Sequence, residues 1–136
     1  MAILLTIIGA VLSAQAQVRL QTLQNCNTVA NLPVVQEIDR AEALINPKIE
    51  AARAAVAKIQ GPASAERAAA CSEAQPLVEA IEASAPPLIL LLDRGIRGTQ
   101  GLRETGCANE LREDKQTLQN EASRLQQDRL VRCLSR

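Results

Sequence analysis

Four cysteines are the residues of this sequence whose type and spacing point most clearly to chemistry. They are Cys26, Cys71, Cys107 and Cys133, and no two of them lie close together in the chain. An even number of well-separated cysteines is typical of a disulfide framework in an exported protein. The alternative is a metal or redox site, but the chain has no C-x-x-C motif and no His to complete a ligand set. The sequence therefore predicts two disulfide bonds.

The expected helices decide between the three possible pairings. A helix over 109–132 has a length of about 36 Å, whereas bridged cysteines have Cα atoms within about 7 Å of each other. Cys107 and Cys133 flank this helix and therefore cannot pair. If the chain reverses direction after each expected helix, the first cysteine meets the fourth at one end of a bundle and the second meets the third at the other. The predicted bonds are Cys26–Cys133 and Cys71–Cys107.

Other candidate groups lack the partners that catalysis needs. Segment 94–98 offers glycine amides and two guanidiniums to an anion, but it follows no strand and has no P-loop Lys-Ser/Thr. Three acids, Glu110, Glu113 and Asp114, fall near the start of the last expected helix, where the helix dipole favours them. No serine has a His partner. We expect no catalytic, cofactor-binding or metal-binding residue, and therefore no enzyme.

The overall composition excludes a further class of partner. Lys and Arg number 15, Asp and Glu also number 15, and the chain contains no Phe, Trp or Tyr. A neutral chain does not neutralise many phosphates, and without aromatic rings it has no platform on which bases could stack. We expect no nucleic-acid partner. A core built without aromatic rings buries less apolar area, which makes the disulfides more important to stability.

The first residues have the pattern of a targeting signal. An apolar stretch over 3–12 is followed by Ala14-x-Ala16, the small-residue pattern that precedes signal-peptidase cleavage. Ten residues are too short to span a bilayer of about 30 Å as a helix. We expect residues 1–16 to be a signal peptide and 17–136 to be one domain without stable membrane insertion. The protein would be secreted, or periplasmic in a bacterium; a buried N-terminal helix is the alternative.

Apolar residues recur with helical spacing through the rest of the chain. One stripe runs from Val34 to Ile59 and keeps its phase across Pro47, where we expect a kink, before Gly61-Pro62 ends the helix. Ser64 is a candidate N-cap for the next helix, which we expect to bend at Pro76 and to stop at Pro86-Pro87. The remaining expected helices cover 18–28, a short segment from Leu88, and Asn109 to about Leu134. The pattern predicts an all-α fold, an antiparallel bundle of four to five helices.

Two segments resemble a known family. They are the charged helix bracketed by Cys107 and Cys133, and the Ala-rich segment Glu66-Arg67-Ala68-Ala69-Ala70-Cys71. Together they resemble secreted insect proteins with a TsetseEP-like domain, which are small, helical and built on spaced cysteines. The resemblance covers about Cys26 to Leu134. It implies an extracellular protein and supplies no catalytic residues.

Two kinds of function remain open after these exclusions. The first is binding or protein–protein interaction, with an unknown protein as the partner. The second is transport of a small hydrophobic ligand between aliphatic helices, as in insect odorant-binding proteins, although those have closer cysteine pairs. An open apolar pocket lined by Ile81 and 88–92 favours a carrier, whereas a solid Ala/Leu core favours an interaction module. A periplasmic inhibitor or colonisation factor is a third possibility.

Overall fold

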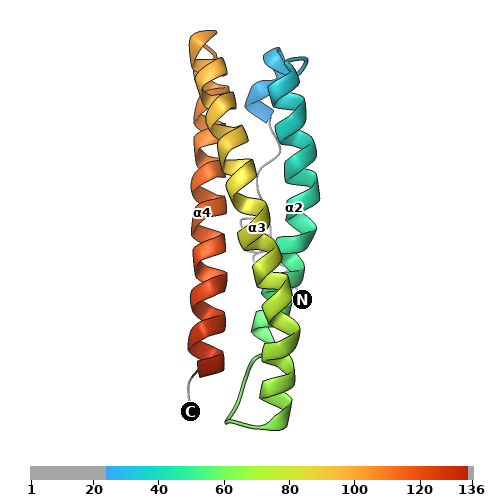
Figure 1. The fold of residues 1–136 in the computed structure, drawn as a ribbon. Coiled ribbons are helices and arrows are strands. Elements are labelled where there is room, and N and C mark those ends of the chain that lie inside the picture. The colour runs from blue at the N-terminus through green and yellow to red at the C-terminus, as the bar shows by residue number, and fades with distance from the viewer. Residues whose placement is uncertain (1–23, 135–136) are drawn as a thin grey trace, which may run out of the picture.

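Three long antiparallel helices lie side by side along one axis (Figure 1). In the computed structural model, which describes residues 24–134, they are α2 (Pro33–Ala57), α3 (Ala65–Gly101) and α4 (Thr105–Leu134). A short 3₁₀ helix, η1 (Gln24–Val29), precedes them. The expected signal segment 1–16 and most of the expected helix 18–28 lie outside the described residues. The described part has no strand, which confirms the all-α prediction.

Local signals set the ends of the first two long helices. Pro33 occupies the first turn of α2, where its missing N–H has no intrahelical partner to lose. After α2 the chain turns at Gly61, whose φ of +80° suits a residue without a side chain. Ser64 then caps α3, since its Oγ accepts a hydrogen bond of 3.2 Å from the backbone N of Arg67. The predicted N-cap is confirmed.

The predicted stop at Pro86-Pro87 is wrong, because α3 continues through both prolines to Gly101. The expected short helix from Leu88 is the second half of α3. As a result, the described part of the bundle has three α-helices and not the four to five that the sequence predicts. Packing explains the continuity: Ile81, Ala85, Leu88 and Leu92 form one buried stripe that spans the two prolines.

The prolines inside the helices all lie on solvent-facing positions. Pro86 and Pro87 are exposed, and so are Glu82 and Ala83, whose carbonyls lose their intrahelical donors to the prolines. Water can hydrogen-bond these carbonyls on the outer side of the bundle. Pro47 in α2 and Pro76 in α3 are exposed in the same way, and neither ends its helix. The prolines therefore remove hydrogen bonds only on the side of each helix where solvent can replace them.

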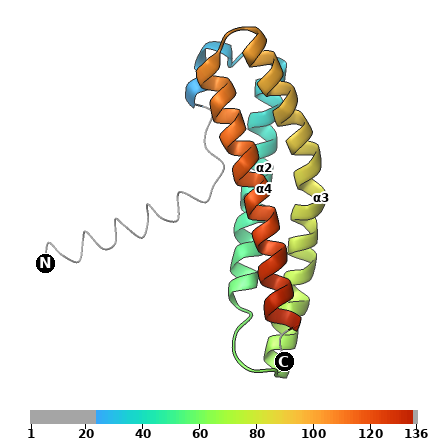
Figure 2. The same ribbon diagram turned by 90° about the vertical axis from the view of Figure 1, so that its left-hand side faces the viewer.

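The disulfide pairing differs from the prediction because α3 is not interrupted at Pro86-Pro87. The bonds are Cys26–Cys107 and Cys71–Cys133, with Cα–Cα distances of 4.6 and 5.9 Å. The predicted Cys26–Cys133 and Cys71–Cys107 bonds assumed one more reversal of the chain than occurs. With α3 unbroken, the end of α3 and the start of α4 reach the same end of the bundle as η1, as Figure 2 shows. That end holds Cys26 with Cys107, and the opposite end holds Cys71 with Cys133.

The hydrophobic core runs between all three helices and follows the predicted stripes. Most of the predicted positions from Val34 to Ile59 are buried. Residues at helical spacing are also buried in α3, from Ala74 through Val78 and Ile81 to Ala85, and so are three leucines spaced by seven in α4. α3 packs along both neighbours, whereas α2 and α4 contact each other much less. None of the described helices is long and apolar enough to cross a membrane. The largest fully buried side chains include Ile38, Ile81, Leu92, Leu111 and Leu118.

Gly95 allows the three helices to approach closely at one level of the core. A Cβ atom built on it would lie 2.6 Å from Cδ1 of Ile38 on α2 and 3.0 Å from Cδ1 of Leu111 on α4. Real Cβ atoms essentially never come as close as 2.6 Å to another carbon, so a side chain at this position would force the buried end of Ile38 to move and would crowd Leu111. Gly95 therefore serves packing and not a turn.

Candidate functional site

The arginine–glycine segment 94–98 is a regular part of α3 and not a loop. The backbone of Gly95 packs against the core, and Nη2 of Arg94 lies 3.6 Å from Oε2 of Glu37 on α2. In a helix interior the amide N–H groups bond within the helix, so they cannot surround an anion. This segment contributes to packing and to the surface charge of α3.

The acids near the start of α4 are placed differently from the expectation. Because α4 begins at Thr105, Glu110 and Asp114 lie beyond its first turn, and their side chains are turned inward. Asp114 is 1% exposed and Glu110 is 3% exposed, whereas Glu113 is exposed. The helix dipole acts within the first turn and does not account for these two burials. Asp114 meets Glu42 on α2, and Glu110 meets the backbone of η1.

Glu42 of α2 completes a buried cluster of acids with these two residues. Its side chain is 4% exposed and hydrogen-bonds to Asp114. Burial, followed by that hydrogen bond and the charges of Asp114, Asp39 and Glu110, raises the pKa of Glu42 from 4.5 to about 10. Glu42 is consequently protonated at neutral pH and donates to Asp114. Glu110 accepts a hydrogen bond of 2.7 Å from the backbone N of Asn25 in η1.

Polar contacts continue along the same side of the bundle, between α2 and α4. Nε of Arg53 lies 3.3 Å from Oε1 of the buried Glu121. Nearer the end of α4, Nη1 of Arg132 donates a hydrogen bond of 3.0 Å to the carbonyl of Val56. Together with the acid cluster, these contacts form a polar seam between α2 and α4. Across the described residues no group of three acids or cysteines has a geometry that could hold a metal ion.

The burial of these acids was not predicted, although the sequence contains a signal for it. In α4 the residues Leu111, Asp114, Leu118, Glu121 and Leu125 follow one another at spacings of three and four. The two acids therefore occupy core-facing positions of a heptad pattern between leucines. In α2, Glu42 likewise falls on the line of Ile38 and Ile45.

An apolar groove lies on the outer side of α2 and α3. It has a volume of about 240 Å³, is open to solvent, and is lined by apolar side chains such as Leu44, Pro87 and Leu91, with Lys48 and Ser84 at its lower end. Leu44 is 70% exposed although it is a large aliphatic residue. Exposed apolar side chains that gather around a hollow mark surfaces for ligands or proteins.

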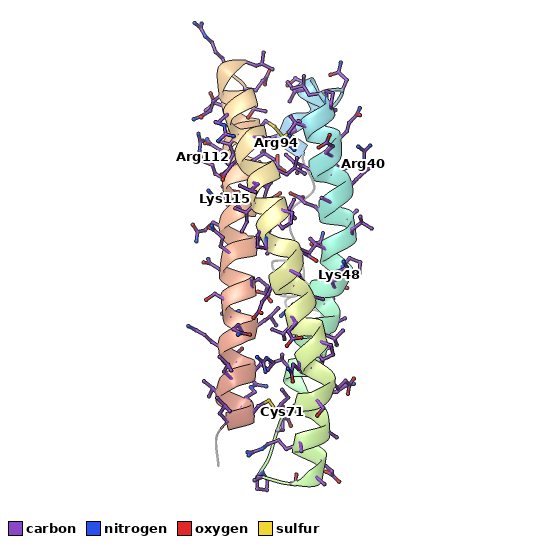
Figure 3. All side chains as sticks on the ribbon, viewed as in Figure 1. Arg40, Lys48, Cys71, Arg94, Arg112 and Lys115 are labelled. Atoms are coloured by element: carbon purple, nitrogen blue, oxygen red, sulfur yellow. A yellow bond between two sulfur atoms is a disulfide. The ribbon has the colours of Figure 1, made fainter. Side chains whose placement is uncertain are left out.

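A second hollow extends this groove toward the end of α3. It shares Pro87 and Leu91 with the first, has a volume of about 470 Å³, and adds Leu90 and the charged residues Asp93, Arg94 and Arg97. Leu90 is 68% exposed. Figure 3 shows Lys48 on α2 and Arg94 on α3 at different heights along the bundle. We call the two hollows together the α2/α3 groove, to which α2 contributes only in the first hollow. The centre of this surface is apolar, and it carries basic side chains near both ends.

The aliphatic run 88–92 is divided between the core and this groove. Leu92 is fully buried, as is Ile81, and Leu88 is almost so. Leu90 and Leu91 face the groove. The residues that were expected to line a carrier's pocket therefore either fill the core or form an open surface. Comparison with protein-family models, curated proteins and solved structures finds no match to this chain.

Proposed function

We propose that the chain is a secreted, non-catalytic binding protein whose interaction surface is the α2/α3 groove. Two disulfides support an oxidising location, and the resemblance to TsetseEP-like proteins agrees with an extracellular role. Glu42 and Asp114 are enclosed between α2 and α4, where burial raises the pKa of Glu42. They have no substrate-accessible neighbour that would suggest acid–base catalysis.

The observation that carries the proposal is the exposure of two leucines beside a hollow. Leu44 and Leu90 are 70% and 68% exposed, whereas the nearby Ile45, Leu88 and Leu92 are buried. Each leucine lines one part of the α2/α3 groove. Covering such side chains removes apolar surface from water, which favours association by about 25 cal/mol per Å².

Site-specific photo-crosslinking tests this surface. A photoreactive amino acid replaces Leu44 or Leu90, and as a matched control it replaces Val131, which is 69% exposed at the far end of α4. Each protein is irradiated in the fluid from which the native protein is recovered. We expect the two groove positions to form adducts with one and the same protein. An excess of wild type should suppress these adducts, and an excess of the Leu44→Ser/Leu90→Ser double variant should not. Equal adducts from position 131, or none from the groove, would contradict the proposal.

A carrier of a small hydrophobic ligand is the second candidate, because the groove has an almost wholly apolar lining beside Lys48. A lipid with an acidic head group would place its chain among the leucines and its charge near this lysine. Native mass spectrometry of protein purified from its own source distinguishes the two functions. A carrier arrives with a bound lipid of constant mass, whereas an interaction module arrives as the bare chain.

The secretory part of the proposal has its own measurement. N-terminal sequencing of the protein recovered outside the cell should begin at Gln17, the residue after the predicted cleavage site. A chain that retains Met1 and carries free thiols would contradict export to an oxidising compartment.

A further inference from the structure

The charges around the α2/α3 groove are unbalanced, although the whole chain is neutral. The residues that line it include the cations Lys48, Arg94 and Arg97 and the single acid Asp93. Asp93 is already engaged, because Nζ of Lys115 on α4 lies 2.7 Å from its Oδ1. A partner would therefore meet a surface whose available charge is positive.

Two of these cations are available to a partner. Arg94 has Glu37 as a neighbour, at 3.6 Å, but Lys48 and Arg97 form no ion pair with any residue that the structure describes. Lys48 lies at one end of the groove and Arg97 at the other. Exposed cations at both ends of an apolar surface select a partner with carboxylates on either side of an apolar stripe.

The shape of the groove fits a helix. From Ser84 to Arg97 it follows α3 for 13 residue steps, which corresponds to about 20 Å or between three and four helical turns. Its first hollow lies between the antiparallel helices α2 and α3, whereas its second hollow is lined by α3 alone. A further helix laid along α3 would therefore pack against both helices at the first hollow and against α3 at the second. Apolar anchors at spacings of three and four on that helix can pack against Leu44 of α2 and Leu90 of α3.

The end of α4 in a second copy of this chain does not suit the groove. That end exposes Leu130, Val131 and Leu134. The flanking segment 124–134 contains three arginines and one aspartate, a net charge of +3 − 1 = +2. Its charge has the same sign as that of the groove, so the two surfaces repel each other. The charges of the groove favour an acidic partner over this helix end.

We infer that the α2/α3 groove binds an amphipathic helix of a partner protein, with aliphatic anchors placed between Leu44 and Leu90 and carboxylates placed against Lys48 and Arg97. The inference rests on the proposed function, because it names the class of partner for the same surface. Affinity comes from burying the apolar stripe, and the choice of partner comes from the charges.

Two synthetic helical peptides test the partner's chemistry. Both carry leucines at spacings of three and four over about four turns, and they differ only in their flanking residues, which are Glu in one and Lys in the other. Binding to the oxidised full chain is measured by fluorescence anisotropy. We expect the Glu peptide to bind at least about tenfold more tightly at low salt, and the difference to shrink when the ionic strength rises from about 50 to about 500 mM.

Charge-reversal variants identify the residues responsible. Lys48→Glu/Arg97→Glu should invert the ranking of the two peptides. The matched control Arg112→Glu/Arg124→Glu makes the same change in net charge on exposed positions of α4 and should preserve the ranking. A ranking unaffected by the groove variant, or equal binding of both peptides, would overturn the inference.

Substitution of the two leucines distinguishes failure of this inference from failure of the proposed function. Suppose that both peptides bind wild type equally well and that Leu44→Ser/Leu90→Ser abolishes this binding. The groove is then a binding surface, and only the acidic class of partner is refuted. If neither peptide binds and dodecanoate binds with dependence on Lys48, the inference is overturned in favour of a carrier. If the leucine variant binds peptides as wild type does, both proposals fail.

Discussion

Glu42 of α2 and Asp114 of α4 are hydrogen-bonded to each other inside the bundle, although both carry carboxyl side chains. Two adjacent buried carboxylates repel each other, so the pair is stable when a proton lies between them. The contact joins the two helices that otherwise touch least. It also lies near the Cys26–Cys107 bond, because Glu110 of the same cluster holds the backbone of η1. The stability of this end of the molecule therefore depends on protonation.

The first prediction concerns pH. The folded pKa of Glu42 is about 10, against an ordinary value of 4.5, so the folded chain retains a proton that the unfolded chain releases as the pH rises. The free energy of unfolding contributed by this group therefore falls between about pH 5 and pH 10, by about 3 kcal/mol at pH 7. Glu42→Gln keeps a donor for Asp114 and does not titrate.

Urea denaturation across this pH range checks the prediction. The difference in unfolding free energy between Glu42→Gln and wild type should grow as the pH rises, and the variant should be the more stable protein at pH 7. Glu82→Gln, an exposed change on α3, should leave the pH profile of wild type unaltered. A constant difference between Glu42→Gln and wild type at all pH values would show that Glu42 is not protonated in the fold.

The second prediction concerns Gly95. Gly95→Ala places a methyl group against Ile38 and Leu111, and we expect a loss of about 1–3 kcal/mol from overpacking in spite of the better helix propensity of Ala. Gly98→Ala is the matched control, because no atom lies within 4 Å of its added Cβ; it should raise stability by up to about 1 kcal/mol. Ile38→Val removes the nearest clashing atom and should partly restore Gly95→Ala. Thermal unfolding of the four proteins measures these effects.

The third prediction concerns the two disulfides. Cys26 and Cys107 are 1% and 0% exposed, whereas Cys71 and Cys133 are only partly buried. A reductant should therefore cleave Cys71–Cys133 first, releasing the end of α4 from α3. Removing either bond by Cys→Ala substitution of both partners should cost about 2–5 kcal/mol. Non-reducing peptide mapping during the titration reports the order, and a Cys26–Cys133 peptide would refute the fold described above.

The fourth prediction tests the register of α3 around its prolines. Leu90 and Leu92 are two residues apart, but one is exposed and the other fully buried. Leu92→Ala should cost about 2–5 kcal/mol, and Leu90→Ala should change stability by less than about 0.5 kcal/mol. Chemical denaturation of both variants gives the comparison. Similar losses at the two positions would mean that the segment after Pro87 has a different orientation.

The fifth prediction concerns the continuity of α3 itself. Pro86→Ala/Pro87→Ala restores two backbone donors on the exposed side of the helix, and we expect a net gain in stability of about 1–3 kcal/mol. The disulfide pairing should remain unchanged. If the helix ended at these prolines, the substitutions would instead lengthen it and disturb the pairing, which peptide mapping would detect.

The sequence was sufficient to predict an all-helical chain and the buried face of its first long helix. The spacing of apolar residues placed α2, and Ser64 marked the start of α3. These features depend on contacts between residues three and four positions apart, so a short stretch of sequence already contains all the residues involved. The groove was not predicted, because the exposure of Leu44 and Leu90 depends on how α2 and α3 pack in the bundle.

Local chemistry alone predicted a break at Pro86-Pro87, yet the helix continues. The rule that proline ends a helix assumes that the lost hydrogen bonds are not compensated. Here both neighbouring helices hold the apolar stripe of α3 on either side of the prolines, and solvent reaches the freed carbonyls. The number of chain reversals, and with it the partner of every cysteine, follows from that packing.

The amino-acid sequence thus specified a helical, disulfide-bonded chain and the residues that face its core, because periodicity and residue type are local properties. It left undetermined the number of helices, the choice of cysteine partners and the burial of Glu42 beside Asp114. Those features depend on which distant segments lie opposite one another, and that is established only when the helices pack together and share the burial of their apolar faces.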